Sequence, residues 1–420
     1  MQETQTMQFR NNLKEIFDRS FENRLPKSIK PLDEEAEEFD KSLSLEEVID
    51  NTIDIILDDN SYYNTEKLEK HLKRVFELQK EIFDSLDINI NLKTRRFISK
   101  SGNIISPEHC LHTIKDTLRI RSYIRGVHFA LHSLVKKYPH EEAINIVYPA
   151  CGPFAPFLLP LILKYKNNNV YKNKLKVTLI DIQKGATLTL QSLISKLGIS
   201  EYIEDIYEMD ALDYFPNENQ KIHMVVLEAM NHGFTKEGHL LLTKHFSQFL
   251  DKDGIFLPQK VIVKAFLNKP NDEYVEQWKE TEGCREILRK EEIMNKRTHL
   301  GDILILTQKN IKNLKEVPSS DPGVKLIECA TVKIPKPVGE YSKQYLLLTA
   351  YINVYNDENV GEYDSGISHP FPMYNFCLNY KPTDIQEDDL LVKSGDVVTF
   401  YYRLDGLPSF IPFKKKEYNR

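Results

Sequence analysis

The sequence predicts an α/β fold with a Rossmann-like, doubly wound sheet, an N-terminal helical region and a C-terminal antiparallel β-barrel-like domain. Three observations support this prediction. Short apolar runs alternate with helical patterns between residues 105 and 258, as strands and crossover helices of a parallel sheet do. The first hundred residues are charged and have helical spacing. Residues 259–420 are rich in β-branched and aromatic residues between turns.

Residues 1–104 are expected to form an accessory helical region. Ser44 and Glu47 make a Ser-x-x-Glu pattern at the start of SLEEVIDNTIDIILDD, which predicts a capped helix. The run NTEKLEKHLKRVFELQKEIFDSL follows with apolar residues at helical spacing. This region shows no chemistry of its own.

Residues 105–258 are expected to form the Rossmann-like domain. Two helical stretches lead into three buried strands, INIVYPA, KVTLIDI and HMVVLEA. A helix after the second strand is predicted to end at the cap residue Gly198, and GIFLPQKVIVKAFL closes the series. Ligands of an open parallel sheet bind outside the carboxyl ends of its strands. We therefore expect the chemistry just after these three strands.

Residues 259–420 are expected to form the β domain. Runs such as GDILILTQ, VKLIECATVKIP, QYLLLTAYINVY, NFCLNY and DVVTFYYRL have the composition of antiparallel strands in a barrel or sandwich. One helical insertion precedes them, at DEYVEQWKETEGCREILRKEEIMNK.

Composition narrows the class of protein. The 420 residues carry a formal net charge of −6, which argues against nucleic acid as the main partner, because phosphate binding favours a basic excess. No apolar run reaches the roughly 18 residues of a spanning helix, and the N-terminus lacks the apolar core of a signal peptide. We therefore expect a cytoplasmic protein with no membrane partner.

The cysteines predict neither a metal site nor a disulfide framework. They are scattered through the chain, and no C-x-x-C spacing occurs. We expect them to be reduced and mostly structural. The five are Cys110, Cys151, Cys284, Cys329 and Cys377.

Three segments after the strands predict a nucleoside pocket. Ala150, Cys151 and Gly152 form a turn after the first strand, where a glycine lets the backbone approach a ligand. Asp181 ends the second strand, and a carboxylate there can accept two hydrogen bonds from ribose hydroxyls. Asp210 is placed to flank an adenine ring. Each acid alone is more often a cap or a solvated turn residue.

A second group of charges surrounds the same strand ends. Arg119, in the helix before the first strand, is a candidate to bind a carboxylate in a bidentate fork. Glu228 and Glu237 flank a loop after the third strand, and a hairpin there could hold both carboxylates on one cationic group. Without other support, a strand-end acid plus a helix-start acid is the simpler interpretation.

These segments resemble class I S-adenosylmethionine (SAM)-dependent methyltransferases. ACGP stands where that family has a glycine-rich loop, LIDI carries its ribose-binding acid and MDA its adenine-side acid. The sequence departs from the family at Tyr148, Ala150 and Phe154, where an acid and two further glycines are usual. The resemblance implies SAM as the cofactor.

The wider pattern resembles protein arginine methyltransferases over roughly residues 105 to 410. The shared features are KDxxRxxxY from Lys115 to Tyr123, the two glutamates nine residues apart and the C-terminal β domain. The resemblance implies that KDxxRxxxY covers SAM and that Glu228 and Glu237 bind guanidinium. It also implies a loop containing His369 beside the pocket and a helical dimerisation arm at about 271–298, hence a homodimer.

The departures from this family concern the acceptor. Ala229 replaces an aromatic residue, Asn231-His232 replaces Gly-Tyr, Pro370 replaces a Trp, and the upstream YFxxY segment is missing. The scaffold therefore matches better than the substrate pocket. Arginine is one candidate acceptor among several.

The function predicted from the sequence is transfer of a methyl group from SAM to a nitrogen, amine or guanidine, of a protein, peptide or metabolite. Glu228 would orient or deprotonate the acceptor with help from Glu237, and His232 or His369 could act as a base. Two alternatives stay open. One is a small-molecule or peptide-tailoring O- or N-methyltransferase on the same scaffold. The other is a non-catalytic binding or scaffold protein that retains the fold.

Overall fold

The computed structural model describes residues 42–61, 64–171, 174–218, 220–269, 272–273, 291–319, 321, 323–336 and 343–415. By compactness the chain forms two units, residues 42–267 with 298–420, and residues 1–41 with 268–297. In the second unit Glu273 pairs with Arg297 and accepts a hydrogen bond from Asn268, near the short helix α11 (Glu291–Met294). Most of the arm expected at 271–298 lies outside the described residues.

The expected N-terminal helices are confirmed. α2 (Leu45–Leu57) begins with the capping box of Ser44 and Glu47, and α3 (Thr65–Ser85) packs against it. Both bury one apolar face, which is what stabilises such helices in water. The short helix α4 (Ile90–Thr94) and a hairpin of β1 (Phe97–Ser99) and β2 (Gly102–Ile104) follow.

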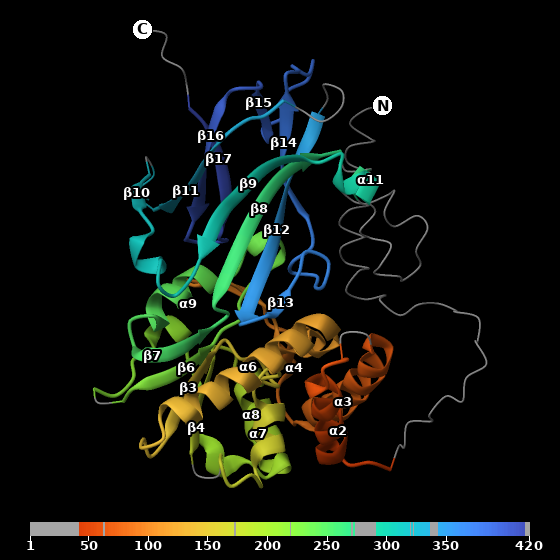
Figure 1. The fold of residues 1–420 in the computed structure, drawn as a ribbon, viewed down its shortest axis with the longest axis vertical. Coiled ribbons are helices and arrows are strands. Elements are labelled where there is room, and N and C mark those ends of the chain that lie inside the picture. The colour runs from red at the N-terminus through yellow and green to blue at the C-terminus, as the bar shows by residue number, and fades with distance from the viewer. Residues whose placement is uncertain are drawn as a thin grey trace, which may run out of the picture. The chain divides into compact units, whose positions relative to one another are not determined.

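Three helical segments lead to the parallel sheet. They are α5 (Pro107–Cys110), the 3-10 helix η1 (Leu111–Lys115) and the long helix α6 (Thr117–Lys137). Nearly the whole first half of α6 is buried, arginines included. In Figure 1, α6 lies between the N-terminal helices and the strands of the sheet.

The five-stranded sheet is parallel, in the order β5-β4-β3-β6-β7. Its strands are β3 (Ile144–Pro149), β4 (Leu175–Asp181), β5 (Ile203–Glu208), β6 (Ile222–Val226) and β7 (Leu250–Leu257). Its helices are α7 (Leu159–Tyr165), α8 (Lys184–Leu197) and α9 (His239–Phe246), with 3-10 turns η2 (Ser200–Tyr202) and η3 (Ala211–Asp213). Pro160 is tolerated because it stands in the first turn of α7, and Gly198 caps α8 with φ 62°. The doubly wound sheet is thus confirmed.

The run GIFLPQKVIVKAFL differs from expectation. It was expected to close the α/β series, yet only its first part does so, as the end of β7. A cis peptide bond joins Leu257 to Pro258, and the chain continues as β8 (Lys260–Asn268) in another sheet. Proline lacks the N–H that would continue a strand ladder, so the parallel sheet ends there.

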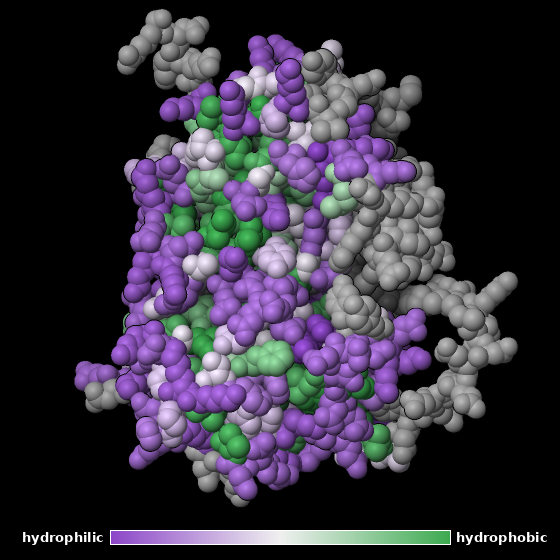
Figure 2. Space-filling model, viewed as in Figure 1, coloured by the Kyte–Doolittle hydropathy of each residue, from purple (hydrophilic) through white to green (hydrophobic). Residues whose placement is uncertain are grey.

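The described residues of the C-terminal half form two further, mostly antiparallel sheets, in which β14 and β15 pair in parallel. One has the order β15-β14-β12-β8-β9, with β13 beside β12, and the other β10-β11-β16-β17. The strands are β9 (Thr298–Leu306), β10 (Glu316–Pro318), β11 (Lys325–Lys333), β12 (Lys343–Tyr355), β13 (Glu358–Val360), β14 (Phe371–Leu378), β15 (Asp389–Val392), β16 (Val397–Arg403) and β17 (Ser409–Lys414). The turns η4 (His232–Phe234) and η7 (Ile311–Asn313) are 3-10 helical. Figure 2 shows apolar residues gathered over these strands, while the helical part of that face is mostly hydrophilic.

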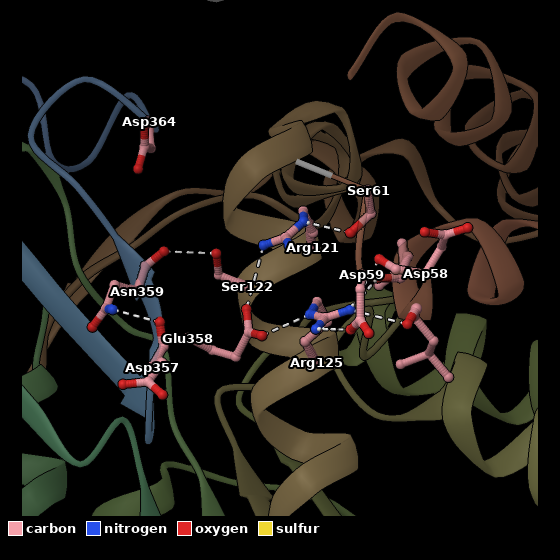
Figure 3. Close-up of polar contacts among 12 residues, drawn as sticks. Asp58, Asp59, Ser61, Arg121, Ser122, Arg125, Asp357, Glu358, Asn359 and Asp364 are labelled. Carbon is pink, nitrogen blue, oxygen red and sulfur yellow. Dashed lines mark hydrogen bonds and ion pairs between the residues drawn. The ribbon is translucent and has the colours of Figure 1, made fainter. Parts of the chain in front are cut away.

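Buried arginines of α6 tie three parts of the larger unit together (Figure 3). Arg121 and Arg125 both pair with Glu358 at the start of β13, with Arg125 Nε 2.6 Å from the carboxylate. Arg125 also donates to the last carbonyls of α2, from Ile56, Leu57 and Asp58, which lack partners inside the helix. We call Arg121, Arg125 and Glu358 the arginine joint.

Candidate functional site

The strand order places the candidate residues at one edge of the sheet. β3 lies between β4 and β6, so the chain leaves β3 toward one side and later returns on the other. Such a switch point opens a crevice at the carboxyl ends of the strands. Gly152 follows β3, Asp181 is the last residue of β4, and Glu228 follows β6. These are the three places at which the sequence predicts chemistry.

The loop after β3 keeps an unusual backbone without the expected glycines. Ala150 has φ 50°, Gly152 φ 67° and Ala155 φ 40°, all in the left-handed region. Ala150 is exposed and Cys151 is buried, with the Cys151 amide donating to the carbonyl of Ile180. Left-handed backbone costs an alanine about 1–2 kcal/mol. The loop conformation is therefore held by its surroundings.

Asp181 fixes that loop to the end of β4. Its carboxylate accepts hydrogen bonds from the Gly152 amide at 2.9 Å and the Gln183 amide at 2.8 Å. Burial raises the pKa of Asp181 to about 6, against the opposing effect of these two bonds. A carboxylate has about four acceptor sites. Both oxygens can therefore accept further donors.

Asp210, predicted beside an adenine ring, caps the 3-10 turn η3. Its carboxylate accepts from the Leu212 amide at 3.0 Å, and its other oxygen lies 3.5 Å from the hydroxyl of Ser101. Ser101 stands in the turn between β1 and β2. The acid therefore meets the N-terminal hairpin at the sheet edge.

Arg119 and Glu228 meet directly. Arg119 Nη1 lies 3.1 Å from a Glu228 carboxylate oxygen, and its Nε lies 3.3 Å from Asp116. All three side chains are nearly buried, at 8%, 9% and 13% exposed. Glu237 contributes a further negative charge nearby. We call Asp116, Arg119, Glu228 and Glu237 the charged cluster.

The loop carrying the two glutamates is a small hairpin, which is one of the two interpretations that the sequence leaves open. Asn231 pairs with Thr235 in an antiparallel bridge, and Gly233 turns the chain with φ 62°. Asn231 Nδ2 donates to Glu237 at 3.2 Å, and the Met230 amide donates to Glu228 at 3.1 Å. The hairpin thus fixes both carboxylates from its own backbone and side chains.

The charged cluster holds more negative than positive charge. With all groups ionised, three carboxylates surround the single guanidinium, which formally leaves two negative charges. Burial raises the pKa of Glu237 to about 7, and repulsion by Glu228 adds to the effect. Burial also raises the pKa of Glu228, against the opposing effect of Arg119. The cluster therefore favours a cationic ligand.

The hairpin of β1 and β2 covers the loop that carries Glu237. The Asn103 amide donates to the Lys236 carbonyl at 2.7 Å. A Cβ at Gly102 would lie 2.7 Å from that carbonyl oxygen, and one at Gly238 would lie 2.2 Å from the Ser101 carbonyl oxygen. Only glycines allow so close a backbone approach. The β1–β2 hairpin at the end of the N-terminal region thus packs directly against the loop that carries Glu237.

The two candidate histidines are both held by backbone carbonyls. His232 Nδ1 lies 2.5 Å from the Gly366 carbonyl oxygen, and its ring stacks on Phe371. His369 Nε2 lies 3.3 Å from the Tyr363 carbonyl oxygen. Carbonyls only accept, so these nitrogens carry hydrogens. Their use as bases stays a prediction.

The structure adds further side chains to those singled out from the sequence. The Tyr123 hydroxyl and Asp116 Oδ1 are buried with no hydrogen-bond partner in the described part of the chain. Cys110 lies beside the β3 loop, its Cβ 3.7 Å from the Cβ position of Gly152. Buried His239 lies with Nδ1 3.5 Å from the Ala229 amide. Asp116 and Tyr123 lie within KDxxRxxxY, so only their orientation was hidden.

Comparisons with known proteins give similarity in structure. No protein-family model and no curated protein sequence matches this chain. The PRMT1 enzyme–prozyme heterotetrameric complex with AdoHcy from Trypanosoma brucei is similar, at 12% identity and TM-score 0.36 over 72% of this chain and 96% of that chain. Protein arginine methyltransferase 10 from Arabidopsis thaliana is similar at 11% identity and TM-score 0.41, over 70% of this chain and 87% of that chain.

The topology defines a Rossmann-like α/β protein with a β domain after the parallel sheet, as the sequence predicts. In the described residues, no helix is long and apolar enough to cross a membrane.

Proposed function

We propose that this protein is a SAM-dependent methyltransferase that acts on a nitrogen, amine or guanidine, of a protein, peptide or metabolite. One observation carries the proposal. The switch-point edge of the sheet holds a ribose-type acid, Asp181, and a buried cluster with excess negative charge, Arg119 with Glu228 and Glu237. Asp181 suits a nucleoside that bears a sulfonium, and the negatively charged cluster suits a cationic methyl acceptor. We call these the cofactor half and the acceptor half of the site.

The cofactor half fits an adenosine with an amino-acid tail. Asp181 would accept from the ribose hydroxyls, Asp210 would lie beside the base, and the loop Ala150-Cys151-Gly152 would lie under the sugar. Arg119 Nη2 has no hydrogen-bond partner among the described residues and could take the tail carboxylate. The unpartnered Tyr123 hydroxyl and Asp116 Oδ1 add further polar positions.

The acceptor half fits a positively charged nitrogen group. Glu228 is held by Arg119 and its own loop, so it can orient a donor without moving. Glu237 uses one oxygen for Asn231, which leaves the other for the acceptor. Because the cluster is largely withdrawn from water, its charges act more strongly than in solvent.

Methyl transfer in this site needs alignment and one proton acceptor. When bound, the cofactor supplies a methyl group already activated on a sulfonium. Glu228 and Glu237 would hold the acceptor nitrogen in line with that methyl group, and methyl transfer would leave S-adenosylhomocysteine as the second product. The nitrogen must lose a proton, and Glu237, with a pKa of about 7, can take it up at neutral pH.

Calorimetry with S-adenosylhomocysteine tests the cofactor half. We expect binding by the wild-type chain and at least tenfold weaker binding by Asp181→Ala, because ribose donors lose a buried acceptor. Asp213→Ala is the matched control. Asp213 lies near Asp210, but its side chain is 56% exposed and, among the described residues, pairs with Lys100 on the surface. A folded wild-type chain that does not bind would refute the proposal and leave the non-catalytic scaffold.

Methyl transfer tests the acceptor half. We expect Glu228→Gln to keep S-adenosylhomocysteine affinity within about threefold and to lower transfer from SAM to arginine- or lysine-containing peptides at least a hundredfold, as loss of a charge-stabilising group does. Equal loss of binding and transfer would contradict the role of Glu228. Transfer to small hydroxyl or amine compounds instead of peptides would favour the tailoring enzyme.

The assembly proposed for the protein is a homodimer through residues 271–298. Light scattering of the full chain gives the mass directly, and a monomer would contradict this part of the proposal.

A further inference from the structure

Two histidines stand one turn apart on α6, away from the charged cluster. His128 and His132 have the i, i+4 spacing that places two imidazoles on one helix face. Their ring centroids are 4.3 Å apart. His128 lies nine residues beyond Arg119, which is about 13 Å along the helix axis. The pair therefore takes no part in the site described above.

The hydrogen bonds of the pair use the Nδ1 atom of each ring. His132 Nδ1 lies 3.1 Å from the backbone carbonyl oxygen of His128. Because a carbonyl oxygen only accepts, this Nδ1 carries the hydrogen, and the lone pair of the neutral ring is on Nε2. His128 Nδ1 hydrogen-bonds the hydroxyl of Tyr165. Tyr165 itself stacks on Tyr171 with centroids 4.2 Å apart, which holds the hydroxyl in place.

The two Nε2 atoms are available to a ligand. Neither makes a hydrogen bond within the described part of the chain, and neither is sealed from solvent, since both residues are half-buried.

We propose that His128 and His132 chelate a late first-row divalent metal ion, Zn²⁺, Ni²⁺ or Cu²⁺, through their Nε2 atoms. In metal-binding histidines, the N–H of the other ring nitrogen characteristically donates a hydrogen bond to a carbonyl or a similar group. His132 shows this arrangement. No group of three His, Cys, Asp or Glu side chains suited to a metal occurs among the described residues. Water or an external ligand completes the coordination, as in open sites.

Metal binding by the untagged full chain tests the proposal. After treatment with a chelator, the protein is dialysed against CuCl₂, NiCl₂ or ZnCl₂, and bound metal is measured per chain. We expect Cu²⁺ to bind most tightly, as such sites generally prefer it. His128→Gln and His132→Gln should each weaken the binding at least tenfold. His140→Gln should leave it unchanged, because His140 is exposed and separate from the pair.

Two further measurements keep the test independent of folding defects. Tyr165→Phe retains the ring and removes the hydroxyl that orients His128, and it should weaken binding several-fold. Electron paramagnetic resonance of the wild-type Cu²⁺ complex should show coupling to imidazole nitrogens. Unchanged affinity in both histidine variants, or a spectrum without nitrogen coupling, would overturn the proposal.

Discussion

Helix α6 carries two sets of buried charges that differ in how completely they are paired. In the arginine joint, Arg121 and Arg125 share Glu358, and Arg125 also donates to three carbonyls of α2. In the charged cluster, a single guanidinium, Arg119, faces Asp116, Glu228 and Glu237. Buried oxygens of Asp116 and Tyr123 there lack hydrogen-bond partners within the described residues.

The two sets differ in whether their buried polar atoms are satisfied. Buried polar groups in folded proteins are normally hydrogen-bonded. The joint follows this rule and connects α2, α6 and β13. The cluster departs from it at the edge of the sheet where a ligand is expected, and it has the charge to attract a cation. Two turns of one helix thus differ in how completely their buried charges are paired.

The largest expected effect is on the joint. Glu358→Met leaves Arg121 and Arg125 buried without their shared carboxylate, and removing one partner of a buried ion pair costs about 3–5 kcal/mol. We expect the free energy of unfolding in urea to fall by that amount. Asp59→Asn is the control, because Asp59 also pairs with Arg125 but is 95% exposed, and exposed pairs contribute less than about 1 kcal/mol. Equal losses in the two variants would contradict the role of the joint.

A smaller effect of opposite sign is expected in the cluster. Glu237→Gln removes a repelled carboxylate, so we expect it to raise the free energy of unfolding at pH 8 by about 1 kcal/mol, as replacing strained functional residues often does. The pH dependence follows from the pKa of about 7 in the folded state, above the usual 4.3 of the unfolded chain.

Between those two values the folded state binds more protons, so stability from this group falls as pH rises from about 4 to about 7. Urea unfolding should therefore show that the free energy of unfolding falls more between pH 5 and pH 8 in the wild-type chain than in Glu237→Gln. If the free energy of unfolding depends on pH in the same way in both proteins, the pKa of Glu237 is not raised in the folded state. Binding of a cationic acceptor should instead strengthen over the upper part of this range, as Glu237 ionises.

The smallest expected effect concerns the strained backbone of the loop after β3. Ala150→Gly relieves the left-handed backbone at φ 50°, and the added freedom of the unfolded chain offsets part of the gain. We expect about 0.5 kcal/mol of stabilisation. Gly198→Ala provides the reverse change at φ 62° with open space around it, and it should cost about 1 kcal/mol. Destabilisation by Ala150→Gly would mean that the alanine is well accommodated.

Most of the helices and strands follow from local patterns in the sequence. Apolar spacing predicts the helices and the parallel strands, and the Ser44–Glu47 capping box and the Gly198 cap are confirmed, because these signals depend on neighbouring residues only. The strand ends at Asp181 and Glu228 could also be read directly. The passage of GIFLPQKVIVKAFL from one sheet into another could not, since both halves have the same strand pattern.

Contacts between the side chains of the candidate site arise only in the folded chain. Arg119 and Glu228 are 109 residues apart, and Ser101 and Asp210 are equally distant. The closure of the β1–β2 hairpin on Lys236 depends on backbone contacts at Gly102 and Gly238 that no local pattern encodes. The burial that raises the pKa of Glu237 arises only when these segments pack together. Local signals therefore place the elements, whereas the charge balance of the site comes from contacts between distant ones.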